Sequence, residues 1–160
     1  MAGSLPAAKS LSPYLAIKGA QAAIDFYVRA FGAEVDFILT DPSDGRIGHA
    51  ELLFGTTRVF IADEYPDFGA VGPETLGGSP VKFHLDVANA DDFVAHAVRH
   101  GATLLRLVKL EFHGDRTGLI ADPFGYSWFV AHRAEAVSPE QMQKRWDALV
   151  APAPDLGSAS

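Results

Sequence analysis

Two histidines and a glutamate are the residues of this sequence best suited to chemistry. His49 and Glu51 are two positions apart in segment 46–54, whose alternation is typical of a β-strand, so their side chains share one face. His84 falls on the polar face of a second such segment, 81–87, whose other face is apolar. Imidazole and carboxylate groups bind zinc, nickel, manganese or iron, and Glu51 is also a candidate catalytic base. The same three residues are compatible with hydrogen-bonded side chains in a half-polar pocket that holds no metal.

A second group of side chains is suited to contacting a small molecule. His113 lies just before a predicted strand that begins at Asp115, where with Arg116 it can contact a polar or anionic group, although Arg116 can instead pair with Asp115 at the surface. Aromatic rings on the inner faces of the strands would favour a flat or apolar ligand, and the alternative place for them is the core. The aromatic candidates are Tyr14, Phe112, Trp128 and Phe129.

The strands and helices predicted to carry these candidates occur twice in the same order. Each half reads as a strand, a helix and three further strands, and short motifs recur in the same order in both halves. The recurring motifs are Gly-Ala after the helix (32–33 and 101–102) and Arg-x-Gly followed by Phe-Gly (46–55 and 116–125). The repeat predicts an α+β fold of tandem βαβββ modules that form a curved mixed sheet.

A single domain is expected over residues 10–150. Its parts are a first module (10–63), a linker or lid (64–80), a second module (81–133) and a C-terminal helix (134–150), and residues 1–9 and 151–160 are expected to be loose. A curved four-stranded sheet with one helix on its outer face leaves an open trough on the other face. Two such units side by side would form a cup-like cavity for a small molecule.

Composition excludes several classes of function. The chain has 160 residues, of which 48% are hydrophobic, and no cysteine, so a disulfide framework and a thiolate nucleophile are excluded. The net charge of −7 and the lack of a window rich in Lys and Arg argue against a nucleic-acid partner. No apolar run approaches about 20 residues, so we expect no membrane-spanning helix and a cytoplasmic location.

Several segments, in order, resemble the glyoxalase/bleomycin-resistance/extradiol dioxygenase superfamily, also called vicinal oxygen chelate. They are AIDFYVRAFGAE (23–34), GHAELLFG (48–55), VKFHLDV (81–87) and DPFGYSWFVAHR (122–133). Three more resemble its PhnB-like branch: IADEYPDFG (61–69), HGDRTGLIADPFG (113–125) and VSPEQMQKRW (137–146). The resemblance implies paired βαβββ modules and a homodimer, with the modules paired within one chain or exchanged between two.

The resemblance also bears on the metal. Metal-bearing members take four ligands from four strands, and these positions correspond to Ser12, Glu51, His84 and Phe129. Glu51 and His84 are competent ligands, and with His49 they would form a His/Glu/His set if the three converge. Ser12 is a poor ligand and Phe129 cannot ligate, which argues against the full glyoxalase I reaction.

Two main functions therefore remain open, because the superfamily includes isomerases, dioxygenases, lyases and non-catalytic drug binders. The first is a glyoxalase-like protein that binds a small molecule and acts as a metal-assisted lyase, isomerase or dioxygenase, with Glu51 as ligand or base. The second is a metal-free binding protein of the antibiotic-resistance type, which sequesters a compound in an aromatic pocket. A purely structural partner subunit is a third and weaker interpretation.

Overall fold

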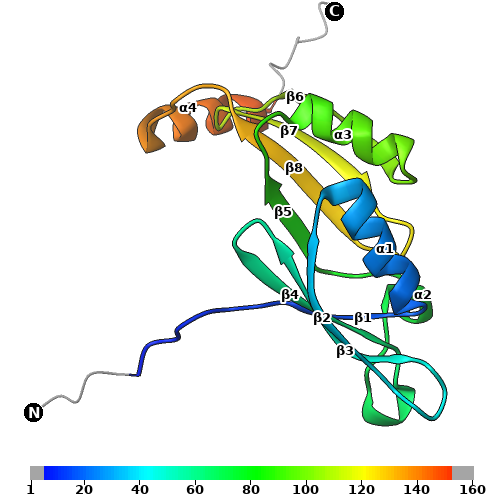
Figure 1. The fold of residues 1–160 in the computed structure, drawn as a ribbon. Coiled ribbons are helices and arrows are strands. Elements are labelled where there is room, and N and C mark those ends of the chain that lie inside the picture. Colours follow the sequence, from blue (N-terminus) through cyan, green and yellow to red (C-terminus); the bar gives the residue numbers. More distant parts are fainter. Residues whose placement is uncertain (1–5, 153–160) are drawn as a thin grey trace, which may run out of the picture.

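The computed structural model describes residues 6–152, and within them the βαβββ pattern occurs twice (Figure 1). The first module contains β1 (Tyr14–Ile17), α1 (Ala20–Phe31), β2 (Glu34–Thr40), β3 (Ile47–Phe54) and β4 (Thr57–Asp63). The second contains β5 (Lys82–Asp86), α3 (Ala90–Arg99), β6 (Thr103–Leu110), β7 (Asp115–Ala121) and β8 (Ser127–Arg133). A 3-10 turn η1 (Pro66–Phe68) and the short helix α2 (Pro73–Leu76) join the modules, and α4 (Pro139–Val150) follows them. The predicted α+β class and repeated modules are confirmed.

Each module forms its own four-stranded mixed sheet within the described residues. The strand orders are β1-β4-β3-β2 and β5-β8-β7-β6, so the two sheets have the same topology. In both, the first strand of the module runs parallel to the last, and the other neighbours are antiparallel. The parallel pairing brings the short strand β1 next to β4, where Tyr14 lies opposite Phe60. This pairing places Tyr14, from the beginning of the module, beside residues of the module's last strand.

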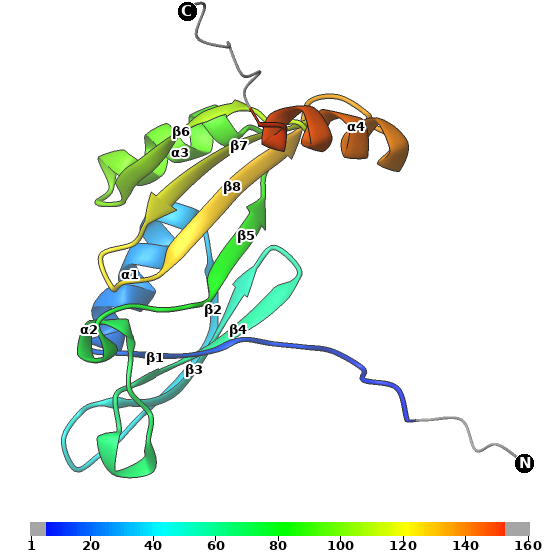
Figure 2. The same ribbon diagram turned by 180° about the vertical axis from the view of Figure 1, so that it is seen from behind.

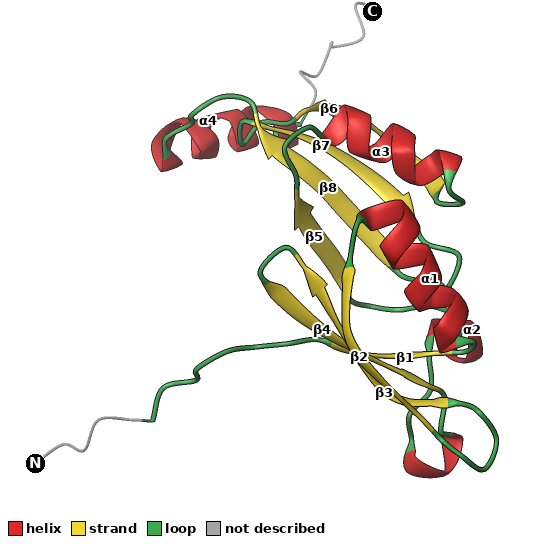
Figure 3. Ribbon diagram, viewed as in Figure 1, coloured by secondary structure: helices red, strands yellow, loops and turns green. Residues whose placement is uncertain are grey.

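One face of each sheet is buried under helices. In β3, Ala50 and Leu52 are fully buried, whereas His49 and Glu51, which alternate with them, are only partly buried. Helices α1 and α3 pack against each other and lie on the same side of the molecule, as Figures 1 and 3 show. The alternation of apolar and polar residues in the strands therefore reports which face is covered.

The two modules share one hydrophobic core. Tyr27 and Phe31 of α1 contact the ring of Trp128 from β8, and Phe54 of β3 stacks on the same indole with ring centroids 5.5 Å apart. Trp128 is 3% exposed, so it fills the core between the modules. The view from behind shows α1 beside the second sheet as well as the first (Figure 2).

A buried carboxylate reinforces this junction. Asp122 accepts hydrogen bonds from the Tyr27 hydroxyl at 2.6 Å and from Nε1 of Trp128 at 2.9 Å. It also accepts from the backbone N–H groups of Phe124 and Tyr126, in the turn between β7 and β8. Because Tyr27 comes from the first module and Asp122 from the second, these bonds tie the modules together.

The faces of the sheets that turn away from this core are open. Strands β2 and β6 are exposed along most of their length. The exposed apolar side chains on these open faces include Phe37, Leu39 and Leu105, whereas Leu104 and Leu107 lie beside α3. Exposed apolar surface of this extent is typical of a contact with another molecule.

Two further expectations concern the ends of the chain and membranes. Of the ends expected to be loose, residues 1–5 and 153–160 lie outside the described residues. Across residues 6–152, none of the helices has both the length and the apolar character needed to cross a bilayer.

Candidate functional site

A chain of hydrogen bonds crosses the open face of the first sheet. The hydroxyl of Tyr14, from β1, lies 2.9 Å from Nδ1 of His49, and Nε2 of His49 lies 3.2 Å from Oε1 of Glu51. The other carboxylate oxygen of Glu51 accepts a short hydrogen bond from Arg58 of β4, which also donates to Asp36 of β2 at 2.7 Å. The pairing of β1 with β4 and of β4 with β3 brings these side chains to one face.

The surroundings of Glu51 keep its carboxyl group ionised. Its side chain is only 16% exposed, and this loss of water acts to raise its pKa. Hydrogen bonds and charge interactions from Arg58 and His49 act in the opposite direction and hold the pKa of Glu51 below its usual value. Hydrogen bonds to Asp36 and to Glu51 in turn raise the pKa of Arg58 above its usual value. The pair is therefore a carboxylate and a guanidinium.

A cavity of about 560 Å³ adjoins this hydrogen-bonded chain, and Tyr14 belongs to both. Aromatic rings form much of its wall: Tyr14 of β1, Tyr65 and Phe68 of the connecting segment, and Tyr126, whose hydroxyl donates to the carbonyl oxygen of Ala16. The remaining lining is made of small residues, including Gly48 and Ala62. The cavity thus has an apolar wall and a polar corner at Tyr14.

The segment expected to be a linker or lid (64–80) supplies one wall of this cavity. Tyr65 forms a β-bridge with Ala70, which folds the segment back on itself around η1. The guanidinium of Arg46 lies 3.9 Å from the centroid of the Tyr65 ring, and its Nη1 donates to the carbonyl oxygen of Glu64. Arg46 therefore holds the segment against the sheet.

The sequence pattern did not identify Tyr65 and Phe68 as site residues. Their presence in a segment with glycines and prolines, directly after a strand, was the available signal. Which face of the sheet the segment covers depends on its bridge and on Arg46, and neither is visible in a local pattern.

The predicted metal ligands are only partly brought together within one chain. His49 and Glu51 are adjacent, but His84 lies on the second sheet, half exposed, with its Nδ1 3.7 Å from Oδ1 of Asp86. Among residues 6–152 there is no group of three or more His, Cys, Asp or Glu side chains arranged to hold a metal ion. Both carboxylate oxygens of Glu51 are already hydrogen-bonded, and Phe129, opposite His84 in the β5–β8 ladder, has no donor atom. The donor set of a single chain therefore does not fit a resident metal.

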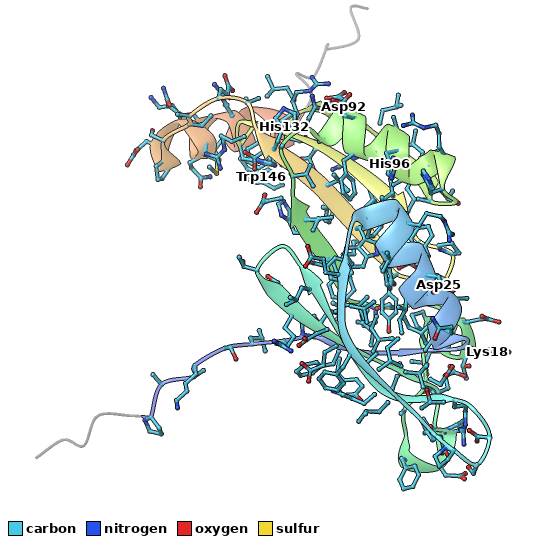
Figure 4. The ribbon with its side chains drawn as sticks, in the orientation of Figure 1. Lys18, Asp25, Asp92, His96, His132 and Trp146 are labelled. Carbon is cyan, nitrogen blue, oxygen red and sulfur yellow. The ribbon has the colours of Figure 1, made fainter. Side chains whose placement is uncertain are left out.

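The other ligand-binding candidates lie in the second module. Phe112 packs against His113 and Trp146, with ring centroids 5.1 and 5.2 Å away, and it lines a smaller cavity of about 290 Å³ with Met142 of α4. Trp146 belongs to α4, and Figure 4 shows its side chain on the lower side of that helix. These residues are not among those that line the larger cavity.

Arg116 and Phe129 also lie in the second module. Arg116 makes two hydrogen bonds to Asp91 at the beginning of α3, 2.9 and 2.8 Å long, rather than pairing with Asp115. Phe129 lies under the guanidinium of Arg106, 5.5 Å from its ring centroid. Trp128 takes the opposite face of β8 and belongs to the shared core.

Two further histidines lie at α3: His96 within the helix and His100 at its C-terminal cap. Figure 4 shows His96 between α3 and α1, where its Nε2 lies 3.0 Å from the carbonyl oxygen of Arg29. His100 stacks on His96 with centroids 4.2 Å apart, and its Nδ1 lies 2.9 Å from the His96 carbonyl oxygen. His96 thus contributes to the contact between the two modules.

Comparison with known proteins gives one family over most of the chain. The model of the Glyoxalase/Bleomycin resistance protein/Dioxygenase superfamily matches residues 11–130. An uncharacterised protein of Mycobacterium tuberculosis is 36% identical over 137 residues, which cover 84% of this chain and 80% of that protein.

Solved structures show the same fold. The crystal structure of an Arabidopsis thaliana gene product superposes with a TM-score of 0.61 at 26% identity, covering 79% of this chain and 98% of that one. A Bacillus cereus protein, described as a putative 3-demethylubiquinone-9 3-methyltransferase and PhnB protein, superposes with a TM-score of 0.61 at 17% identity, covering 78% of this chain and 99% of that one. The second likeness concerns the fold alone.

Proposed function

The chain belongs to the Glyoxalase/Bleomycin resistance protein/Dioxygenase superfamily, and from this premise we propose that it binds a small, flat, mainly apolar molecule in the cavity beside Tyr14. The observation that carries the proposal is the cavity wall of aromatic rings with a hydrogen-bonding group at one corner. Sites for small molecules combine a mostly apolar lining with a few polar groups that fix the orientation of the ligand.

The size and chemistry of the cavity suit a ligand with one or two rings. Its volume of about 560 Å³ lies within the range of about 300–1,000 Å³ found for such sites. The faces of Tyr65, Phe68 and Tyr126 offer stacking or edge contacts to an aromatic ligand. The Tyr14 hydroxyl and the imidazole behind it would bind the polar end of the molecule.

We also propose that the protein works as a homodimer in which a second copy covers the open faces of the sheets. The exposed apolar side chains Phe37 and Leu39 of β2 and Leu105 of β6 support this arrangement. In a dimer with a two-fold axis, the same surface of each copy faces its partner. Both copies would therefore bury these apolar side chains in one interface. The cavity beside Tyr14 would then be bounded by the partner as well as by its own chain.

A metal-assisted enzyme is the second candidate, favoured by the adjacency of His49 and Glu51 at 3.2 Å. It requires another ligand, which His84 of the partner subunit would have to supply in such a dimer. Zinc, nickel, manganese and iron are the metals that this donor set would suit.

Binding is tested with the fluorescent probe anilinonaphthalene sulfonate, an aromatic anion. We expect saturable binding to the native protein and about tenfold weaker binding to Phe68→Ala, because Phe68 contributes a ring to the cavity wall. Leu76→Ala is the matched control, since Leu76 is an exposed apolar residue of the same segment that does not line the cavity. Equal affinity of Phe68→Ala and the native protein, or no saturable binding, would contradict the proposal.

The metal candidate is tested on the same preparations by calorimetric titration with each divalent ion. Stoichiometric binding that is lost in both Glu51→Gln and His84→Ala would support it. Binding that is unchanged in these variants, or no binding, would contradict it.

A further inference from the structure

The directions of the hydrogen bonds at Tyr14 follow from the charge of Glu51. A carboxylate only accepts hydrogen bonds, so the proton between His49 and Glu51 belongs to Nε2 of the imidazole. In neutral histidine the other nitrogen, Nδ1, then carries a lone pair. With His49 neutral, Nδ1 accepts the hydrogen bond of 2.9 Å from the Tyr14 hydroxyl.

The oxygen of Tyr14, a residue that lines the cavity, is thereby left with free lone pairs. Its only proton is directed at His49, and its ring lines the cavity that we propose binds a small molecule. When this oxygen takes a proton from a bound molecule, Tyr14 can pass its own hydroxyl proton to Nδ1 of His49. The order of groups is that of a nucleophile or base, a histidine and an orienting carboxylate.

We propose that Tyr14, His49 and Glu51 form a metal-independent proton relay that catalyses the keto–enol interconversion of an aryl-substituted carbonyl compound. This inference rests on the proposed function, because the compound must first occupy the cavity. Tyr14 is the catalytic residue that touches the substrate, His49 receives the proton, and Glu51 is a positioning residue.

The reaction is balanced without a redox partner or second substrate. The bond between hydrogen and the carbon next to the carbonyl group breaks, and its electron pair forms the carbon–carbon double bond of an enolate. The proton goes to the Tyr14 oxygen as the Tyr14 hydroxyl proton goes to Nδ1 of His49, so His49 becomes an imidazolium and Tyr14 stays neutral. The reverse transfer, directed at the enolate oxygen, gives the enol and restores His49.

The geometry assigns the base to Tyr14 rather than to Glu51. Both oxygens of Glu51 are hydrogen-bonded, to His49 and to Arg58, and Glu51 is not among the residues that line the cavity. Its negative charge instead stabilises the imidazolium that forms when His49 takes the proton. The aromatic wall selects a substrate whose enol is flat and conjugated with an aryl ring, such as an arylpyruvate.

The first test follows exchange of the methylene protons of phenylpyruvate in deuterium oxide by proton NMR, with binding measured by calorimetry. The native protein is expected to accelerate exchange at least a hundredfold over buffer. Tyr14→Phe keeps the ring, so binding should change by less than about threefold while exchange falls by about a hundredfold, the usual contribution of a positioned acid–base group. His49→Gln should lose exchange to the same extent, and His100→Gln at the C-cap of α3, outside the site, should behave as the native protein does.

The second test asks whether Glu51 sets the position of the His49 proton. In Glu51→Gln, Arg58 will hold the amide oxygen, since a guanidinium cannot accept a hydrogen bond, so the amide NH₂ group will face His49. Nε2 must then accept, the proton moves to Nδ1, and Tyr14 can no longer pass its proton on. Nitrogen NMR of isotope-labelled histidine should show the Nε2–H form in the native protein and the Nδ1–H form in Glu51→Gln, with exchange lost.

The outcomes separate this inference from the function on which it rests. Phenylpyruvate binding without accelerated exchange, exchange that survives in Tyr14→Phe, or an Nδ1–H form of His49 in the native protein would overturn the relay and leave binding intact. Binding of anilinonaphthalene sulfonate but not of phenylpyruvate would overturn the proposed substrate class. Binding of neither probe would overturn the proposed function itself.

Discussion

Removal of the Tyr27 hydroxyl is expected to destabilise the whole chain, because that hydroxyl joins the two modules through Asp122. In Tyr27→Phe, Asp122 keeps its bonds to Nε1 of Trp128 and to the backbone of Phe124 and Tyr126, but loses the bond of 2.6 Å. A hydrogen bond to a charged group contributes about 1.5–3 kcal/mol. We therefore expect a loss of about 2 kcal/mol, which lowers the Tm of a chain of this size by about 4–8 °C.

The same substitution should have a recognisable pH dependence. Burial, and then the charge and hydrogen bond of Asp122, raise the pKa of Tyr27 well above its usual value. A raised folded-state pKa gives stability that is complete below the unfolded-state pKa, about 10, and is lost as the pH rises through the folded-state value. The stability difference between the native protein and Tyr27→Phe should therefore shrink as the pH is raised above about 10.

Urea unfolding at neutral and at alkaline pH measures both effects. Tyr126→Phe is the control, since it removes a bond of 3.2 Å to the Ala16 carbonyl oxygen and should cost about 1 kcal/mol or less. A Tyr27→Phe variant within about 0.5 kcal/mol of the native protein, an amount typical of a surface substitution, would refute the reasoning. Separate unfolding transitions for the two modules would refute the shared core.

Three further predictions concern the interface, a close contact and an ion pair. Phe37→Glu and Leu105→Glu should shift the protein from dimer to monomer in analytical ultracentrifugation, whereas Leu76→Glu should not; dimers in all three would contradict the proposed interface. Gly72→Ala should lower stability by about 1–3 kcal/mol and weaken probe binding, because a Cβ atom there would lie 2.4 Å from the Ala16 carbonyl oxygen. An unchanged Tm would show that the fold does not need the close approach of residue 72 to Ala16. Arg116→Ala should change the free energy of unfolding by less than about 1 kcal/mol, as measured in urea, because its ion pair with Asp91 is exposed, and a larger loss would indicate a further role for Arg116.

The order of elements could be predicted from the sequence because it depends on local patterns. Alternating strands, a first helix that ends at Gly32, a second that ends shortly before Gly101, and the capping box of Ser138 and Gln141 are each specified within a few residues. The shared face of His49 and Glu51 follows from the two-residue period of a strand in the same way.

The completed site could not be predicted, because it depends on contacts between distant segments. Tyr14 meets His49 only because β1 runs parallel to β4, and Tyr65 reaches the cavity only because its segment folds back over the sheet. The position of His84 follows from how the modules pack through their helices rather than from the pattern of β5. Sequence alternation gives the face of a side chain, and tertiary packing decides what that face meets.

The most direct test of the account is to locate a bound molecule by protein-observed NMR. On addition of anilinonaphthalene sulfonate, the backbone amide signals of Gly48, Gly69 and Ala70, which line the cavity beside Tyr14, should shift and saturate together. Shifts confined to Phe112, Met142 and Trp146 around the smaller cavity near α4, or no saturable shifts, would contradict the claim that this cavity is the binding site.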